Sequence, residues 1–189
     1  MRGVLVEVPE SLLAERRRLG VDRFDEMWGG ELHMVLPPSN EHQRIGRDIV
    51  LVLAPLAEEA GLSLLYEAGL FDPSAEGHSE YRVPDLVVFG ESQASTRGVE
   101  GGAALAVEIR SPGDETFEKL PFYGRVGVEE VLVIDRDTKA VRHWSRVGGG
   151  LVEDDGPDSG WVRLGCLPVR LRSEDGRLVV EGPFGIRAI

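Results

Sequence analysis

Two acidic residues stand at positions where a strand would present a carboxylate. Asp85 follows Val83-Pro84 and begins the apolar run 86–89, and Glu108 interrupts the apolar run 103–109. Proline stiffens the entry to a strand, and side chains alternate across it, so both acids are expected at exposed edges of buried strands. Two carboxylates on neighbouring strands can hold Mg²⁺ or Mn²⁺, which prefer hard oxygen ligands.

Lys119 is the basic residue that would complete such a site. A bound divalent ion can activate water and stabilise charge on a phosphoryl oxygen, and a nearby ammonium can orient that water or neutralise the transition state. Each residue also has an ordinary interpretation. Asp85 could be a capping residue, Glu108 a surface partner of Arg110, and Lys119 a solvated side chain.

Other candidates have stronger ordinary interpretations. Glu41 precedes the apolar stripe of a helix and could join the site, but an acid in a first helical turn is favoured by the helix dipole alone. Tyr123 is expected in the core or beside the site, and the single cysteine, Cys166, in the core or in a semi-buried position. The histidines lack metal-ligand spacing, with His42 the best candidate because it adjoins Glu41; the four are His33, His42, His78 and His143.

The clearest element is a helix that begins near Ser39 or Asn40 and ends near Gly61. Ile45, Ile49, Val52, Leu53 and Leu56 recur at helical spacing. Pro55 predicts a kink or an end near Ala54. A second, short helix is expected over 114–128, with Pro121 either in its first turn or kinking its axis.

Strands are expected where short apolar runs are bounded by turn residues. Residues 1–30 are expected to form a helical lead-in around PESLLAERRRLG. Residues 135–139 predict a hairpin connection. The expected strands are 31–37, 62–71, 85–90, 103–109, 131–135, 140–144, 161–165 and 177–182.

This order predicts an α/β (α+β) fold with a central mixed sheet flanked by helices. We expect one domain over residues 1–189, with 1–30 a possible N-terminal extension. No apolar run could span a bilayer and no secretory signal is evident, so we expect a cytoplasmic protein without a membrane partner. The net charge of −12 opposes non-specific attraction to nucleic acid. Phosphate-loop, dinucleotide, hydrolase-elbow and zinc-peptidase motifs are absent.

The segments VPDLVVF and VEIRSPGDETFEKLPFYGRVGVEEVLVIDRDT together resemble the Uma-type restriction endonuclease family of the PD-(D/E)XK nuclease superfamily. The likeness spans roughly residues 30 to 146 and rests on the combined order of residues. The shared features are Asp85, Glu108, the Ser111-Pro112 exit, Lys119, Tyr123, and Gly127-Val128-x-Glu130 leading to Asp135.

The resemblance implies a restriction-endonuclease-like fold in which Asp85, Glu108 and the backbone carbonyl of Ile109 bind Mg²⁺ or Mn²⁺. Arg110 departs from the superfamily pattern, because it stands where lysine is usual and cannot act as a base. In the Uma-type pattern Lys119 takes that place. The implied activity is hydrolysis of DNA by a metal-dependent endonuclease, with a homodimer expected by analogy. The alternative is an inactive nuclease-fold module that acts through self-association or a protein partner.

Overall fold

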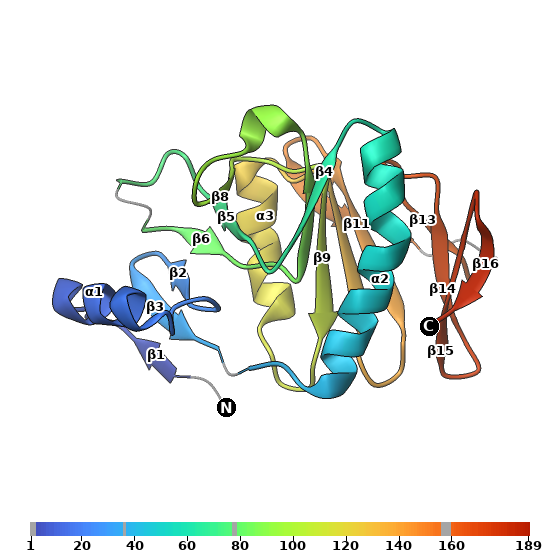
Figure 1. Cartoon of the computed structure of the whole chain (residues 1–189). Helices are drawn as coiled ribbons and strands as arrows, with labels where there is room; N and C mark the ends of the chain where they lie inside the picture. Colours follow the sequence, from blue (N-terminus) through green and yellow to red (C-terminus); the bar gives the residue numbers. More distant parts are fainter. Residues whose placement is uncertain (1–2, 36, 77–78, 156–159) are drawn as a thin grey trace.

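The computed structural model describes residues 3–35, 37–76, 79–155 and 160–189. Three sheets and three α-helices make up this part of the chain (Figure 1). The helices are α1 (Glu10–Leu19), α2 (Asn40–Glu59) and α3 (Leu120–Val126), and 3₁₀ turns lie at Glu91–Gln93 and Thr116–Lys119. None of the described helices is long and apolar enough to cross a membrane.

The central sheet is mixed, as the sequence predicts. Its β9 and β10 are parallel, and its other pairs are antiparallel. In spatial order its strands are β12 (Gly150–Glu153), β11 (Val141–Val147), β10 (Glu130–Asp135), β9 (Leu105–Arg110), β7 (Leu86–Phe89) and β4 (Ser63–Tyr66). The predicted hairpin at 135–139 is confirmed by the pairing of β10 with β11.

Two further sheets stand at either side. The N-terminal sheet runs β1 (Gly3–Leu5), β3 (Glu31–Met34), β2 (Glu26–Trp28), β6 (Tyr81–Arg82), β5 (Gly69–Phe71) and β8 (Gly98–Glu100). The C-terminal sheet runs β13 (Val162–Arg163), β14 (Arg170–Glu174), β15 (Arg177–Gly182) and β16 (Gly185–Ala188). Figure 1 shows these sheets at opposite ends of the molecule.

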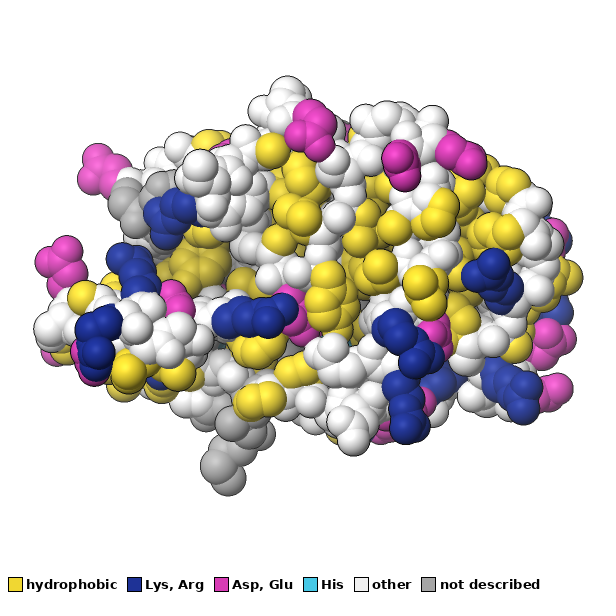
Figure 2. Space-filling model, in the orientation of Figure 1, with side chains coloured by type: hydrophobic (Ala, Val, Ile, Leu, Met, Phe, Trp, Pro, Cys, Tyr) yellow, Lys and Arg dark blue, Asp and Glu magenta, His cyan; other side chains and the backbone are white. Residues whose placement is uncertain are grey.

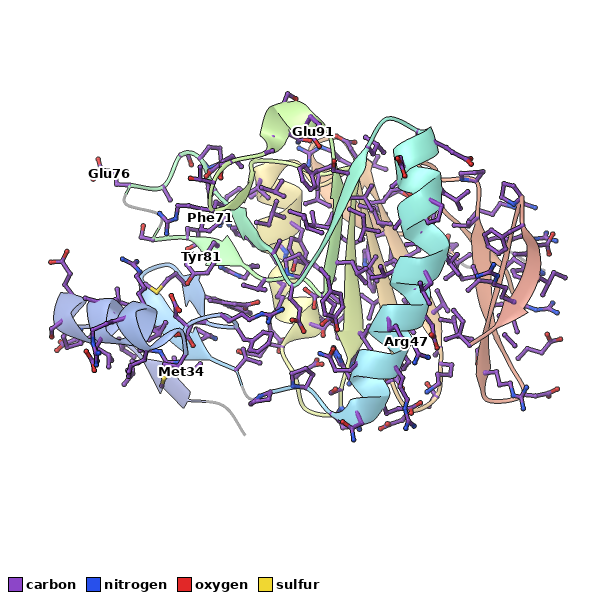
Figure 3. All side chains as sticks on the ribbon, viewed as in Figure 1. Met34, Arg47, Phe71, Glu76, Tyr81 and Glu91 are labelled. Atoms are coloured by element: carbon purple, nitrogen blue, oxygen red, sulfur yellow. The ribbon has the colours of Figure 1, made fainter. Side chains whose placement is uncertain are left out.

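Helices α2 and α3 cover opposite faces of the central sheet, and side chains fill the space between helices and sheet (Figures 1 and 3). Alternation along the strands divides the core. Leu86, Val107 and Ile109 pack with α2 and the C-terminal sheet, whereas Val87 and Ala106 pack with Phe122 and Tyr123 of α3. The face of each strand residue therefore decides which helix it meets.

Helix α2 confirms the predicted cap but not the predicted break. The Ser39 side chain accepts a hydrogen bond from the His42 backbone N–H at 3.3 Å. The helix runs through Pro55 to Glu59, so the expected end near Ala54 is wrong. Buried side chains before and after the proline hold the last turn on the sheet, because packing outweighs the loss of one backbone hydrogen bond.

Three other expectations need correction. Residues 62–71 form two strands in different sheets, because the backbone turns at Glu67, whose φ is 50°. The lead-in 1–30 contains the expected helix α1 but also β1 and β2. The helix over 114–128 is shorter, since Thr116–Lys119 is a 3₁₀ turn before α3; Pro121 stands in the first turn of α3, as predicted.

A buried histidine joins the central sheet to the segment that leads into the C-terminal sheet. His143 Nε2 lies 2.9 Å from Glu130 Oε2, and His143 Nδ1 lies 2.5 Å from Asp154 Oδ2. Glu130 also accepts hydrogen bonds from the backbone N–H groups of Gly165 and Cys166, at 2.8 and 2.6 Å. Burial opposes protonation of His143, but the two carboxylates outweigh it and raise the pKa of its imidazole.

The raised pKa predicts a pH-dependent stability. A group whose pKa is higher in the folded state stabilises the fold fully below its unfolded pKa, which is about 6.5 for histidine. That contribution is lost as pH rises through the folded pKa. We expect His143→Gln to flatten the decline in the free energy of unfolding above about pH 6.5, measured by urea titration at several pH values. An equal decline in both proteins would contradict this assignment.

Candidate active site

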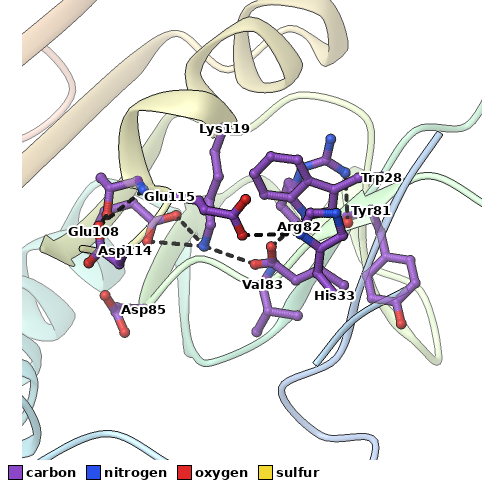
Figure 4. Close-up of polar contacts among 12 residues, drawn as sticks. Trp28, His33, Tyr81, Arg82, Val83, Asp85, Glu108, Asp114, Glu115 and Lys119 are labelled. Carbon is purple, nitrogen blue, oxygen red and sulfur yellow. Dashed lines mark hydrogen bonds and ion pairs between the residues drawn. The ribbon is translucent and has the colours of Figure 1, made fainter. Parts of the chain in front are cut away.

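The predicted carboxylates meet at the end of the pair β7/β9, on the α3 side of the central sheet (Figure 4). Leu86 lies opposite Val107 in this antiparallel pair. Continuing the register by one residue puts Asp85 opposite Glu108, where Cβ atoms are typically about 5 Å apart. Asp85 is two positions before Val87, and Glu108 is two positions after Ala106; both of these core residues face α3. Side chains two positions apart in a strand share a face. Asp85 and Glu108 therefore project from the same face.

Glu108 is enclosed by groups that donate hydrogen bonds to it. It is only 4% exposed. Tyr123 O–H donates to Glu108 Oε1, and Lys119 Nζ lies 3.3 Å from Glu108 Oε2. Burial raises the pKa of the Glu108 carboxyl; Lys119 opposes this rise, and the negative charges of Asp85 and Glu26 add to it. Burial and Glu108 also raise the pKa of the Tyr123 phenol, which stays a donor.

Lys119 lies between two buried carboxylates. Its Nζ is 2.9 Å from Glu26 Oε1 and 3.2 Å from Glu108 Oε1. Burial favours the neutral amine, but Glu108 and Glu26 outweigh it and raise the pKa of Lys119 above its usual value. The side chain is thus a fixed ammonium, which can neutralise negative charge but cannot take a proton from water.

Glu26 is the site residue that sequence reasoning missed. It is 2% exposed and lies in β2. Besides contacting Lys119, it accepts hydrogen bonds from Trp28 Nε1 at 2.8 Å and from the Val83 backbone N–H at 2.9 Å. The signal that could have found it is the Gly29-Gly30 pair, because two glycines between apolar runs favour a tight hairpin. Both have positive φ, 58° and 90°, and β2 and β3 pair across them.

Asp85 is held from two sides. Its Oδ2 accepts a hydrogen bond from the Ile109 backbone N–H at 2.6 Å, and its Oδ1 lies 3.2 Å from His42 Nε2. Burial opposes protonation of His42, but Asp85 outweighs it and raises the pKa of the imidazole. At 15% side-chain exposure Asp85 is more accessible than Glu108 at 5%. The site is therefore more open to solvent at Asp85 than at Glu108.

Two sequence candidates lie outside this cluster. Glu41 is 49% exposed at its side chain and pairs with Lys139 at 2.8 Å. Arg110 pairs with Asp135 at 2.9 Å and covers the Phe117 ring. Glu108 therefore pairs with Lys119. Its ordinary interpretation required a pair with Arg110 instead.

The histidines are divided among separate places. His33 stacks on Trp28 with ring centroids 4.4 Å apart and lies 3.1 Å from Glu115. His42 contacts Asp85, and His143 lies between Glu130 and Asp154. His78 lies outside the described residues.

The face of the molecule seen in Figure 2 is of mixed charge. On the face seen in Figure 2, Lys and Arg side chains stand in small separate groups, several of them beside Asp or Glu. Hollows of about 600 and 520 Å³ open elsewhere, beside β11–β13 and β13–β15, and neither is lined by Asp85 or Glu108.

Most of the sequence matches a known protein family. The sequence profile of the family Uma2, described as "Putative restriction endonuclease", matches residues 21–173. The chain belongs to the Uma2 family. The match includes Asp85, Glu108, Lys119 and also Glu26. It begins earlier than the resemblance seen in the sequence, which begins near residue 30.

A solved structure shares the fold of this Uma2 protein. It is described as "a putative nuclease belonging to DUF820 from Anabaena variabilis ATCC 29413". The TM-score is 0.58 at 19% sequence identity, over 74% of this chain and 80% of that one. No curated protein matches the sequence. The family and the nuclease fold predicted from the sequence are both confirmed.

Proposed function

We propose that this Uma2 protein is a metal-dependent endonuclease that hydrolyses phosphodiester bonds of DNA. The observation that carries the proposal is the surplus of negative charge around Lys119. When they are ionised, Asp85, Glu108 and Glu26 carry three negative charges, which Lys119 and, when it is protonated, His42 offset only in part. Buried charge that remains unpaired is costly, so a divalent cation would be bound favourably there.

The oxygen donors at this place suit Mg²⁺ or Mn²⁺. Asp85 and Glu108 supply hard carboxylate oxygens from opposite positions on adjacent strands. The Ile109 N–H points toward Asp85, and the N–H and C=O of one strand residue face the same neighbour, so the Ile109 carbonyl is directed to the same side. Among the described residues no three His, Cys, Asp or Glu side chains are grouped as a metal site. Main-chain oxygen and water would therefore complete the coordination.

Each protein group has a distinct role in the proposed reaction. A bound divalent cation supplies Lewis acidity and a water of lowered pKa. The Lys119 ammonium lies against Glu108 and offsets charge on the phosphoryl oxygens. Tyr123 and Lys119 together fix the orientation of Glu108. The net charge of −12 opposes attraction to DNA, so DNA would be held only weakly without metal.

Cleavage of supercoiled and single-stranded DNA with Mg²⁺ or Mn²⁺ tests the proposal. We expect Asp85→Asn to lower the cleavage rate at least about 100-fold, since even indirect contacts to a metal contribute about 10- to 100-fold. The matched control is Asp25→Asn, which removes another buried acid, 3% exposed and paired with Arg16. If the purified protein cuts no DNA, or if Asp85→Asn cuts like Asp25→Asn, the protein is the inactive module.

A further inference from the structure

His42 lies at the start of α2 with its ring directed at Asp85. The residue is 8% exposed, and its Nε2 is 3.2 Å from Asp85 Oδ1. Its backbone N–H donates to Ser39 Oγ in the helix cap. The capped first turn thereby fixes the position from which the imidazole reaches the carboxylate.

The two donors to Asp85 come from different elements. The Ile109 N–H of β9 binds Oδ2 at 2.6 Å, and His42 of α2 lies against Oδ1. Each carboxylate oxygen has two lone pairs, so one on each oxygen remains for another ligand. A carboxylate held at both oxygens has little freedom to rotate. Its free lone pairs are thus directed before any ligand arrives.

We propose that His42 is a positioning residue that fixes the Asp85 carboxylate for binding a divalent cation, an inference that rests on the proposed function. Partners of this kind commonly orient the ligands of metal ions. The contact of Nε2 with Asp85 requires a hydrogen on Nε2, so His42 donates and Asp85 accepts.

The surroundings of His42 favour this indirect role over direct binding of the ion. Nε2 is already directed at Asp85, and Nδ1 is enclosed without a hydrogen-bond partner among the described residues. Residues 3–35, 37–76, 79–155 and 160–189 also contain no group of three metal-binding side chains. The histidine therefore contributes a donor to a carboxylate and not a third ligand.

Direct titration with Mn²⁺, followed by electron paramagnetic resonance of the free ion, tests the role without an activity assay. His42→Gln keeps an N–H donor near the position of Nε2, whereas His42→Leu removes the donor at similar volume. We expect His42→Leu to weaken Mn²⁺ binding about 10- to 100-fold, and His42→Gln to bind within a few-fold of the natural protein. The matched control is His143→Leu, which removes another buried histidine between carboxylates.

The outcomes separate this inference from the proposed function. If the natural protein binds Mn²⁺ and Asp85→Asn does not, the metal site stands, and the two His42 variants decide the role of His42. Equal binding by both variants and the natural protein would overturn it. Equally weakened Mn²⁺ binding in His42→Leu and His42→Gln would also overturn the positioning role, because the effect would then belong to the imidazole ring and not to its N–H donor. Absence of Mn²⁺ binding in the natural protein would overturn both proposals. Circular dichroism of each variant establishes that it is folded.

Discussion

Replacing Lys119 with methionine is expected to lower the free energy of unfolding by about 3 to 5 kcal/mol, as when one partner of a buried ion pair is removed. The reason is that Glu26 and Glu108, 3% and 5% exposed at their side chains, would lose the ammonium between them. Methionine fills a similar volume, so the change isolates the charge. Urea denaturation near pH 8 measures the difference.

The other lysine of the chain provides the matched control for this experiment. Lys139 pairs with Glu41, whose side chain is 49% exposed. Lys139 is itself buried, but its removal leaves Glu41 solvated and no carboxylate buried without a partner, so Lys139→Met should have the smaller effect. We also expect Mg²⁺ to stabilise Lys119→Met more than it stabilises the natural protein, because a divalent ion can offset the exposed surplus of negative charge. Equal destabilisation by the two lysine variants would rule out the buried-charge account.

The pairing of Asp85 with Glu108 could be anticipated because both signals are local, whereas Lys119 was singled out by the family resemblance. An acid that interrupts an apolar run must either be exposed or have a partner, since an isolated buried charge is costly. Proline before Asp85 marked the start of its strand, and alternation assigned Glu108 to a face. These constraints predicted which groups meet, although they could not give the register that puts Asp85 opposite Glu108.

The places of Glu26 and His42 in the site could not be predicted from the sequence, because they depend on contacts between distant segments. Glu26 lies 82 positions before Glu108 in the sequence, and only the packing of the N-terminal sheet against α3 brings the two to one lysine. His42 was considered as a neighbour of Glu41, but its position in the first turn of α2 directs it to Asp85 instead. Periodicity defines a helix face but not the strand end that this face meets.

Local backbone conformation explains the remaining differences in the fold. The run 62–71 has the composition of a strand throughout, yet one residue with positive φ, Glu67, passes the chain from the central sheet to the N-terminal sheet. Such a conformation is uncommon for a residue other than glycine and has no sequence signature at a glutamate. Pro55 shows the converse, since a strong local signal for a helix end was outweighed by packing on both sides of it.

The largest effect on activity is expected from Glu108→Gln. This change keeps the size of the side chain and an acceptor for Tyr123 O–H but removes the charge that faces Lys119 and the proposed cation. A metal ion contributes several kcal/mol of charge stabilisation, and about 4 kcal/mol corresponds to about a 1,000-fold change in rate. We therefore expect DNA cleavage to fall about 1,000-fold, measured under single-turnover conditions with Mn²⁺ at saturation for the natural protein.

Glu130→Gln distinguishes loss of chemistry from loss of a buried acid. Glu130 is 8% exposed, on the neighbouring strand β10, and accepts from His143, Gly165 and Cys166. Its replacement should lower stability while cleavage continues, whereas Glu108→Gln should retain the fold, because Lys119 keeps Glu26 as its partner. If the two variants lose cleavage in parallel with stability, Glu108 acts only as a structural residue. If only Glu108→Gln loses cleavage while it stays folded, the charge of Glu108 takes part in the reaction.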